Sequence, residues 1–499
     1  MQRKIEELLK NVKGYLPDAD TDMILLAYDF AAEAHKGQKR MTGEDYVVHP
    51  VETALTLSKM KVDFPTIIAG LLHDVPEDTS YTVEDIRKNF GDEVAGLTSR
   101  VAKLGKLKYR GMDRYVENLR KMFVAIAEDI RVIFIKFADR LHNLRTLSAL
   151  PLEKQIRIAK ESIEIYAAIA NRLGMGQMKG ELEDEAFKHL YPKEYKEIEG
   201  DLALDLEKKK KIIATVPKFA KEKLEENGIP VLYIDSRQKR LFSLYQKLLE
   251  HNMDISKIYD MLAIRVIVGS IAECYAALGI IHQYFKPLKG RIKDYISNPK
   301  PNGYQSLHTT VFCERNVVEF QIRTESMNHE AEYGISAQVH WYYSEKGSAT
   351  AIDKRLQWVK ELTKLAVIKD HKEYLQSLKV EALKNRIFAF TPKGDVIDLP
   401  EGSTPIDFAY HIHTDLGNKC IGAKVNEVLV PLSSELLSGD VVEITIDRNR
   451  KTPSSDWLNI VKTSMAKEKI KAALRRENLL DRLASFIGTT LPKSSNKSH

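Results

Sequence analysis

Two histidines and two aspartates in the N-terminal part of the chain have the side chains of a metal site. His49 precedes a proline, His73 and Asp74 are adjacent in LLHDVPEDT, and Asp139 lies in FADRLHNLRT. Imidazole and carboxylate ligands together suit Mn2+, Fe2+ or Zn2+ better than Ca2+, which prefers cages of oxygen atoms. The three cysteines of the chain are scattered, so any metal would be held by histidine and carboxylate side chains.

Two further acids follow this pair closely. Glu77 and Asp78 come three and four residues after Asp74, a spacing that places all three carboxylates on one face of a helix. An ordinary acidic helix surface is the alternative, but it does not explain why the apolar IIAGLL leads directly into the cluster. Pro76 has no N–H, so we expect a kink or a new first helical turn there. A metal at this place would generate hydroxide to attack phosphorus while the acids position water or transfer protons, which is phosphoester hydrolysis.

A second group of polar residues, in SRQKRLFSLYQK, has the composition of a phosphate-binding segment. Its donors are spaced along a loop and the first two turns of a helix: Arg237, Lys239, Ser243 and Lys247. Together with the helix dipole, such donors can clamp a triphosphate. For this segment taken alone, a plain basic helix end is the alternative interpretation.

Two acids on predicted strands could hold a metal ion beside those phosphate-binding donors. Asp260 leads into the apolar run MLAIRVIV, typical of a central strand, and the alternation in VVEFQIR places Glu319 on its polar face. A carboxylate on each of two strands can hold Mg2+ during phosphate transfer to a hydroxyl group, and exposed strand-end acids are the alternative. Between them, GRIKDYISNPKPNGYQSLHTT has the Gly, Pro and Asn content of a loop, in which Tyr304 is placed to stack on a base.

These groups require two different scaffolds. Apolar residues recur at three- and four-residue spacing up to about residue 195, and no strand pattern precedes residue 230, so the first part is predicted to be all helical. After the lysine-rich EKKKKIIATVPKF, short β-rich runs alternate with helical stretches, which indicates a mixed α/β domain. The predicted strands of this domain are 230–234, 261–268, 309–312 and 317–322.

The remaining third of the chain has a different pattern of predicted elements. A charged helix is predicted over 351–384, followed by close-spaced strands in IFAFT, DVIDL, CIGAKV and VVEITI around one short helix. A basic helix is predicted from Trp457 to about Leu483, and the polar end LPKSSNKSH is predicted to be disordered.

Composition excludes several classes of protein. The chain has 499 residues, 43% hydrophobic and 29% charged, which is ordinary for a globular protein of about three domains and excludes wholesale disorder. No apolar stretch approaches the roughly 20 residues of a membrane span, and MQRKIEELLK is no signal peptide, so we expect a cytoplasmic protein. The net charge of +6 is unevenly placed, since residues 448–499 carry +8 and the rest −2. That tail is either a solvated amphipathic helix or a contact for nucleic acid.

The helical part resembles a known hydrolase. HKGQKRMTGEDYVVHP, HDVPED, FADRLHNLRT and IANRLGMGQMKGELEDEAF are similar to the HD domain of the long RelA/SpoT-type alarmone enzymes. The resemblance implies a Mn2+ site with four ligands: His49, His73, Asp74 and Asp139. It also implies that Glu77 and Asp78 are catalytic acids and that Arg40 and Asn143 contact the bound nucleotide. The family often has Lys where this chain has Met41, which cannot supply the lysine charge.

The middle part resembles the synthetase domain of the same family, in YDMLAIRVIV, VEFQIRT and the segment between them. That domain transfers pyrophosphate from ATP to the 3′-hydroxyl of GTP or GDP to give (p)ppGpp. The resemblance implies that Asp260 and Glu319 are catalytic and bind Mg2+, that Tyr304 stacks on guanine and that His308 lies near the acceptor phosphates. It also implies a set of ATP contacts, two arginines around the adenine and three donors on the phosphates: Arg237, Arg265, Lys239, Ser243 and Lys247.

Two details refine the comparison with the synthetase domain. Arg291, Lys293 and Asp294 match the basic RxKD loop of bifunctional members, whose cationic residues belong to the nucleotide site. Ser236 and Gln238 depart from the usual GRPK of the family, while the charged donors remain.

The third part, IFAFTPKGDVIDLPEGSTPIDFAYHIHTDLGNKCIGAKVN, resembles a TGS domain, a small β-grasp module. The resemblance implies that it senses uncharged tRNA, in the setting of the ribosome, with His413 near the tRNA acceptor end. A packed or solvent-exposed histidine is the alternative. Family members normally continue into zinc-finger and ACT modules, which we expect this chain to lack.

The sequence thus predicts a multidomain protein with five segments: an all-α HD-type hydrolase domain (1–195), an α/β synthetase domain with a nucleotidyltransferase-like mixed sheet (196–345), a linker helix (346–385), a TGS domain (386–447), and the start of a helical region with a disordered tail (448–499). The implied function is synthesis and hydrolysis of (p)ppGpp from ATP and GTP or GDP in the stringent response. The alternatives are a hydrolase whose synthetase domain only senses nucleotide, and a regulator that binds tRNA or the ribosome.

Overall fold

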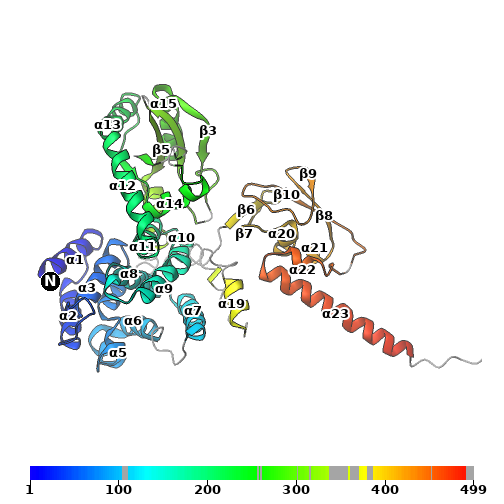
Figure 1. Ribbon diagram of the computed structural model, residues 1–499, viewed down its shortest axis with the longest axis horizontal. Coiled ribbons are helices and arrows are strands. Elements are labelled where there is room, and N and C mark those ends of the chain that lie inside the picture. Colours follow the sequence, from blue (N-terminus) through cyan, green and yellow to red (C-terminus); the bar gives the residue numbers. More distant parts are fainter. Residues whose placement is uncertain are drawn as a thin grey trace, which may run out of the picture. The chain divides into compact units, whose positions relative to one another are not determined.

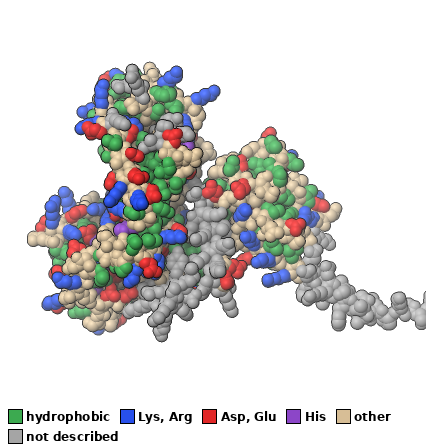
Figure 2. All heavy atoms as spheres, viewed as in Figure 1, with side chains coloured by type: hydrophobic (Ala, Val, Ile, Leu, Met, Phe, Trp, Pro, Cys, Tyr) green, Lys and Arg blue, Asp and Glu red, His purple; other side chains and the backbone are tan. Residues whose placement is uncertain are grey.

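The chain divides into two compact units, residues 1–366 and 367–499 (Figure 1). The computed structural model describes residues 1–103, 111–254, 258, 261–300, 302–313, 316–336, 358–359, 363, 370–378, 386–450 and 452–489. Within these residues, every helix is too short or too polar to span a membrane. Acidic and basic side chains are interspersed over the face drawn in Figure 2.

The first unit begins with helices only, as the sequence predicted. In chain order they are α1 (Gln2–Tyr15), α2 (Thr21–Ala34), α3 (Val48–Lys59), α4 (Phe64–Leu72), α5 (Val75–Asp78), α6 (Val83–Lys103), α7 (Gly111–Glu128), α8 (Arg131–Arg145), the 3-10 turn η1 (Leu147–Ala149), α9 (Leu152–Glu161), the π-helical turn η2 (Ser162–Ala167), α10 (Ala168–Arg172), α11 (Gly176–Leu190), α12 (Pro192–Lys208) and α13 (Lys210–Glu226).

The helix α4 is the centre of this helical region. It packs against α2, α3, α6 and α8, and all its residues from Thr66 to Leu72 are buried. Gly70 lies close to α3, because a Cβ atom there would collide with the side chain of Leu57. The apolar run IIAGLL is therefore a buried helix that ends directly before the buried His73 and the half-buried Asp74.

A five-stranded mixed sheet follows in the same unit. Its strands are β1 (Tyr233–Gln238), β2 (Leu262–Val268), β3 (Pro287–Asp294), β4 (Leu307–Cys313) and β5 (Asn316–Thr324). They lie in the order β1-β2-β5-β4-β3, with β2 and β5 parallel and the other pairs antiparallel. The apolar β2 is an interior strand, as predicted, whereas β1 begins three residues later than predicted.

The prediction of a loop from Gly290 was wrong at its start. Residues Gly290–Asp294 complete the edge strand β3, which pairs with β4 through a register shift between Pro287 and Ile292. Most residues of β3 are exposed on both faces, so they lack the alternation of apolar and polar residues by which a strand is recognised.

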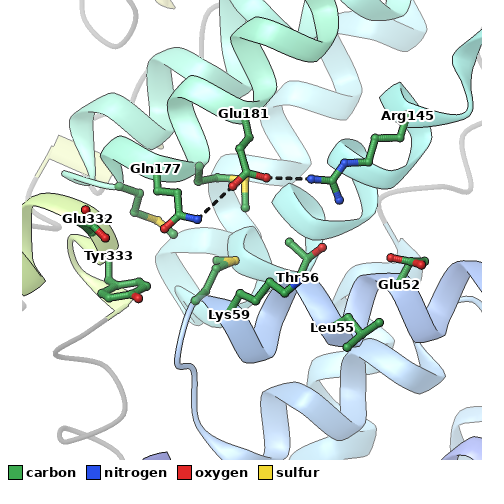
Figure 3. A pocket seen from close by; sticks show the side chains of 12 residues that line it. Glu52, Leu55, Thr56, Lys59, Arg145, Gln177, Glu181, Glu332 and Tyr333 are labelled. Carbon is green, nitrogen blue, oxygen red and sulfur yellow. Dashed lines mark hydrogen bonds and ion pairs between the residues drawn. The ribbon is translucent and has the colours of Figure 1, made fainter. Parts of the chain in front are cut away.

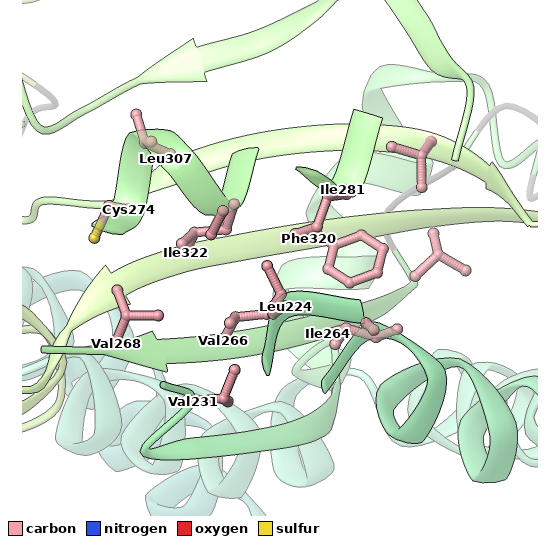
Figure 4. Packing of buried hydrophobic residues seen from close by; sticks show 14 of the residues in the cluster. Leu224, Val231, Ile264, Val266, Val268, Cys274, Ile281, Leu307, Phe320 and Ile322 are labelled. Carbon is pink, nitrogen blue, oxygen red and sulfur yellow. The ribbon is translucent and has the colours of Figure 1, made fainter. Parts of the chain in front are cut away.

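One face of the sheet is covered by helices. The helices α13 and α15 (Ile271–Tyr284) pack their apolar residues against Val266, Phe320, Ile322 and their neighbours (Figure 4). Two shorter helices, α14 (Leu241–Glu250) and α16 (Glu325–Tyr333), follow β1 and β5. The helix α14 packs against α11 and α12 through an aromatic cluster that includes Phe187 and Tyr245. The other face of the sheet carries polar side chains, among them Arg265, Glu319 and His308.

The helical region and the sheet meet at closely packed glycines. Gly334 at the end of α16 has φ = 56°, and a Cβ atom there would overlap the backbone of Leu173 and Gly174. The Ile335 N–H donates to the Leu173 carbonyl over 3.0 Å, and the Ser336 hydroxyl donates to the Met60 carbonyl over 3.1 Å. This junction joins the end of α16 to the helical region by backbone contacts.

The second unit holds two small sheets and five helices in its described residues. Its elements are α19 (His371–Leu378), β6 (Arg386–Phe390), β7 (Val396–Pro400), α20 (Pro405–Ile412), α21 (Thr414–Asn418), β8 (Cys420–Val425), β9 (Val428–Val430), β10 (Val442–Ile446), α22 (Trp457–Ile460) and α23 (Ser464–Thr489). The helix α19 is the main described part of the stretch 351–384 that was predicted to be helical. The polar tail predicted to be disordered lies outside the described residues.

Two helix predictions in this unit were too simple. One short helix was expected among the strands, but His413 is extended and separates α20 from α21. The single basic helix expected from Trp457 is also two helices, because the buried Asp407 carboxylate accepts the N–H groups of Lys462 and Thr463. The Thr463 hydroxyl then caps α23 by accepting the Ala466 N–H. The four boundaries proposed between the five segments of the chain stay predictions.

Candidate active sites

Three of the four predicted metal ligands meet at one place in the helical region. His49 lies in the first turn of α3, and His73 and Asp74 lie between α4 and α5. One potential ligand atom from each of the three lies within 4.8 Å of the others. His49 Nε2 is 3.4 Å from Asp74 Oδ2, and His73 Nε2 is 3.1 Å from Asp74 Oδ1. The helices α3 and α4 therefore bring together residues that are 24 positions apart in sequence.

The fourth predicted ligand, Asp139, approaches this cluster from α8. Its Oδ1 atom is 3.3 Å from His49 Nε2, but the residue is not part of the group of three. Asp139 Oδ1 also accepts a hydrogen bond of 2.5 Å from Asn143, and its Oδ2 accepts one of 2.8 Å from Lys136. Asp139 would have to share its oxygens between these donors and a metal.

The ring of His73 fits a divalent metal. Its Nδ1 is 2.8 Å from the Gly70 carbonyl, which can only accept, so Nδ1 carries the proton and the neutral ring has its lone pair on Nε2. The buried Nε2 has no hydrogen-bond partner among the described residues and faces the Asp74 carboxylate, another acceptor. A cation between these two acceptors would satisfy both, so the residues fit the metal that the sequence predicted.

The predicted catalytic acids begin the helix α5. Pro76 lies in its first turn, so the expected new helical start is observed. The Tyr46 hydroxyl is 3.0 Å from Asp74 Oδ2 and 2.7 Å from Asp78 Oδ2, so these two carboxylates lie close together, although Asp74 precedes α5 and does not lie on one helix face with Asp78. Glu77 is half-buried in the same turn. Burial and then the charge of Asp74 raise the pKa of Tyr46, so its hydroxyl remains a hydrogen-bond donor.

The two predicted nucleotide contacts lie beside Asp139. Arg40 Nη2 donates to Asn143 Oδ1 over 2.6 Å, and Asn143 in turn donates to Asp139. The buried Nη1 of Arg40 has no hydrogen-bond partner within the described parts of the chain. Met41, at the position where the family often has Lys, is 75% exposed.

The charges around Asp139 oppose the effect of its burial. Burial by itself would raise the pKa of Asp139, but Lys136 and His49 hold it well below its ordinary value. Burial would similarly lower the pKa of Lys136, and Asp139 raises it instead. Burial and the neighbouring His49 lower the pKa of His142 to about 3, so the His142 ring is neutral.

Several of the predicted synthetase residues lie on one face of the sheet. The register places Arg237, Ala263, Glu319 and Thr310 in one row across β1, β2, β5 and β4. The next row contains the five residues Asp235, Arg265, Gln321, His308 and Lys293. The third row includes the buried Arg323. The alternation read from VVEFQIR is confirmed, because Val318, Phe320 and Ile322 are buried in the core on the opposite face.

The two arginines predicted to surround adenine meet at one carboxylate. Arg265 forms two parallel hydrogen bonds of 2.9 Å with Asp235, and its Nη1 contacts Glu332 on α16. Arg237 Nη1 is 4.0 Å from the same Glu332 oxygen. The structure thus brings the arginines together while engaging them in ion pairs, which a nucleotide would have to displace or share.

A ring of contacts joins Glu319 to Tyr304. Gln321 donates to Glu319 over 2.8 Å, and His308 Nδ1 is 3.5 Å from the same Glu319 oxygen. His308 Nε2 is 2.8 Å from the Tyr304 hydroxyl. The Arg323 guanidinium lies 5.3 Å from the centre of the Tyr304 ring and donates to Gln321, which closes the ring of contacts. Tyr304, His308 and Glu319 are therefore held in one network.

The remaining predicted residues of this site are placed on three elements. Lys239 follows β1, and its N–H donates to the Met261 carbonyl over 3.1 Å. Ser243 and Lys247 lie on α14, as predicted, although Arg237 lies on a strand where a loop was expected. The exposed Arg291 and Lys293 lie on β3: their neighbour Asp294 accepts hydrogen bonds from the backbone of Ile296 and Ser297. Asp260 lies outside the described residues.

A cavity of about 280 Å³ lies where the helical region meets α16 (Figure 3). Glu181 on one wall accepts hydrogen bonds from Gln177 and Arg145, and Lys59 lies on the side of α3. Glu332 also lines it, so this cavity adjoins the carboxylate that pairs with Arg265. The predicted metal ligands and catalytic acids are not among its lining residues.

The last predicted residue, His413, lies in the second unit. It is exposed, and its Nδ1 accepts the Asp415 N–H over 3.2 Å at the start of α21. Sequence reasoning missed three residues of the helical site: Tyr46, Lys136 and His142. The spacing of Asp139, His142 and Asn143, at i, i+3 and i+4 on one helix, was a signal that could have identified His142.

Three stretches of the chain match known domain families. Residues 27–176 match the HD domain, residues 236–348 match the region found in RelA and SpoT proteins, and residues 387–446 match the TGS domain. These matches confirm the predicted combination of a helical HD domain, a mixed-sheet domain and a TGS domain.

Long relatives extend over nearly the whole chain. A Myxococcus xanthus protein named GTP pyrophosphokinase is 44% identical over 475 residues, covering 93% of this chain and 62% of the relative. The guanosine-3′,5′-bis(diphosphate) 3′-pyrophosphohydrolase of Aquifex aeolicus is 46% identical over 477 residues, 95% of this chain and 67% of the relative. The bifunctional (p)ppGpp synthase/hydrolase SpoT of Escherichia coli is 43% identical over 475 residues, 94% and 67% respectively. The chain thus spans about two thirds of these relatives or slightly less.

Proposed function

The chain belongs to the RelA/SpoT family, and from that premise we propose that it is a bifunctional enzyme that makes and hydrolyses (p)ppGpp. The observation that carries the proposal is that one chain contains both the His49–His73–Asp74 cluster and the polar sheet face around Glu319. The relatives named above include a pyrophosphokinase, a pyrophosphohydrolase and a bifunctional protein, which supports both activities. A cytoplasmic location is part of the same proposal.

For hydrolysis, we propose that His49, His73, Asp74 and Asp139 hold Mn2+, which would supply a Lewis acid and an activated water when bound. Glu77 and Asp78 would orient that water or accept its proton, and the Tyr46 hydroxyl keeps Asp74 and Asp78 in place. Arg40 and Asn143 would bind the nucleotide, because the Arg40 guanidinium still has a buried donor without a partner among the described residues. The substrate would be (p)ppGpp, cleaved at its 3′-pyrophosphate.

For synthesis, we propose that Glu319 binds Mg2+ together with Asp260, and that ATP transfers its pyrophosphate to the 3′-hydroxyl of GTP or GDP. Arg237 and Arg265 would contact the adenine, and cationic and hydroxyl donors would bind the ATP phosphates: Lys239, Ser243 and Lys247. Tyr304 would stack on guanine. The acceptor phosphates would be contacted by the polar residues of β3 and β4: Arg291, Lys293 and His308. The shared sheet face supports this assignment.

The experiment that tests the proposal uses one protein under two conditions. Purified chain is incubated with Mn2+ and labelled ppGpp, and separately with Mg2+, ATP and GDP, and the products of each reaction are resolved. We expect pyrophosphate and GDP from the first incubation and ppGpp from the second. Hydrolysis without synthesis would instead support a hydrolase whose sheet domain only senses nucleotide.

For the second unit we propose contacts with uncharged tRNA, and with the ribosome, through His413 and the basic helix α23. The exposure of His413 and the positive charge of residues 448–499 support this partner. Binding of deacylated tRNA should weaken with rising salt and with His413→Ala. Undiminished binding by that variant would remove His413 from the proposed contact.

A further inference from the structure

The two rings of the metal cluster are held by different kinds of partner. His73 Nδ1 lies 2.8 Å from the Gly70 carbonyl, whereas His49 Nδ1 lies 2.8 Å from His142 Nδ1. A carbonyl accepts and never donates, so it permits only the His73 tautomer with a proton on Nδ1. An imidazole nitrogen can donate or accept, so the partner of His49 permits two arrangements.

Only one arrangement leaves His49 able to bind a metal. If His142 donates to His49, then His49 carries its proton on Nε2 and donates it toward Asp74 and Asp139, which lie 3.4 and 3.3 Å away. If His49 donates to His142, the His49 lone pair lies on Nε2, where those same carboxylates would complete a ligand set. The direction of one hydrogen bond therefore decides whether the cluster is a metal site.

The side chain of His142 is buried against that of His49. Its side chain is buried, with the residue only 5% exposed, and its ring centre is 4.9 Å from that of His49. It lies on α8 one turn after Asp139 and directly before Asn143. The helix α8 thus supplies both a predicted ligand and the group that faces the ring of another.

We propose that His142 is a positioning residue which, by accepting the His49 Nδ1 proton, selects the tautomer of His49 that binds the metal and fixes the orientation of its ring. This inference rests on the proposed Mn2+ site and adds a residue to it. In this role His142 would touch neither the metal nor the substrate. It acts through His49, as the Gly70 carbonyl acts through His73.

The test compares variants at position 142 by metal affinity in the absence of nucleotide. His142→Asn keeps an acceptor oxygen near the position of Nδ1, whereas His142→Leu fills a similar volume without an acceptor. His189→Leu is the matched control, because His189 is a half-buried histidine of the helical region whose Nδ1 is bonded to Gln155. Mn2+ binding is measured by titration calorimetry or by the EPR signal of free Mn2+, and thermal melting of the metal-free protein is recorded for each variant.

We expect His142→Leu to weaken Mn2+ binding about 10- to 100-fold, the usual cost of losing the outer partner of a metal-binding histidine. His142→Asn should recover most of that loss, and His189→Leu should bind like the wild type. Mn2+ binding by His142→Leu at the wild-type affinity would overturn the inference, as would equal losses for Asn and Leu at an unchanged melting temperature.

A second comparison covers the case in which His142→Leu does not fold. His142→Gln keeps the amide but moves it one carbon away from the Nδ1 position, so it should bind Mn2+ more weakly than His142→Asn. Equal affinity of these two polar variants would contradict the role assigned to His142. Failure of the proposed function would look different, because wild-type protein would then bind Mn2+ in this assay without hydrolysing ppGpp.

Discussion

The helical site contains buried polar atoms that lack hydrogen-bond partners within the described residues, whereas Arg237 and Arg265 of the sheet site are engaged in ion pairs. His73 Nε2 and Arg40 Nη1 are buried and unbonded. On the sheet, Arg265 is already engaged by Asp235 and Glu332. An unsatisfied buried donor or acceptor costs about 1–3 kcal/mol, so these two atoms of the helical site favour the binding of a ligand.

The contrast follows from the two scaffolds. Helices α3, α4 and α8 pack together, and each helix satisfies its own backbone hydrogen bonds. Polar side chains of different helices therefore need not pair with one another. On a sheet face, neighbouring strands bring side chains within about 5 Å of one another, so opposite charges such as Arg265 and Asp235 pair directly. The sheet site must exchange protein ion pairs for nucleotide contacts.

The largest expected effect is at the helical site. Asp74→Asn removes a carboxylate that both histidines face, so we expect (p)ppGpp hydrolysis to fall by about 10³-fold or more while synthesis is retained. Product analysis under both conditions measures this. Asp92→Asn, which changes an exposed acid of α6, is the control and should hydrolyse normally. Near-normal hydrolysis by Asp74→Asn would remove the cluster from the active site.

The reciprocal change is at the sheet site. Glu319→Gln keeps the shape of the side chain but removes the charge that faces His308, so we expect ppGpp synthesis to fall by about 10²- to 10³-fold with hydrolysis retained. Initial rates with Mg2+, ATP and GDP give the result. Glu222→Gln on the exposed face of α13 serves as the control. A parallel loss of both activities would mean that the two sites are not independent.

A smaller effect on synthesis is expected from changes at Arg323, whose guanidinium lies near the Tyr304 ring. Arg323 is 1% exposed, with Nε and Nη1 unbonded among the described residues, and it is the one buried donor of the sheet site that resembles the helical pattern. Arg323→Met should lower kcat/KM for synthesis about 10- to 100-fold, which corresponds to the 1.5–3 kcal/mol of a charged hydrogen bond. Arg323→Lys should recover part of the loss if the charge near Tyr304 matters. Equal losses in Met and Lys would assign Arg323 to packing alone.

The smallest expected effect concerns the ion pairs of Glu332, which a nucleotide would have to displace or share. Glu332→Gln frees Arg265 and Arg237 from a carboxylate that competes with nucleotide, so we expect KM for ATP to fall about two- to fivefold, the effect of an ion pair worth up to about 1 kcal/mol. Steady-state kinetics at varied ATP measures the change, with Glu325→Gln at the exposed start of α16 as control. A rise in KM would show that Glu332 orients the arginines productively and does not compete with ATP.

Many features of the candidate sites could be predicted from the sequence because they depend on the spacing of residues within one element. The helix after Pro76 and the alternating polar face of β5 are consequences of residues within one turn or one strand. Where prediction was wrong, a distant partner decided the outcome. The edge strand β3 exists because β4 pairs with it, and the break before α23 exists because Asp407, more than 50 residues earlier, takes the N–H groups of Lys462 and Thr463.

The sequence by itself determined which residue types are available and which local face each occupies: the HD pair, the acids of α5, the donors of α14 and the polar face of β5. Only the tertiary structure decided which of these meet, and with what partners. His142 became the partner of His49 through the packing of α8 on α3, and Arg265 became paired with Glu332 through the docking of α16. The physical reason is that spacing along a chain fixes neighbours within one element, whereas contacts between elements depend on how buried surfaces fit together.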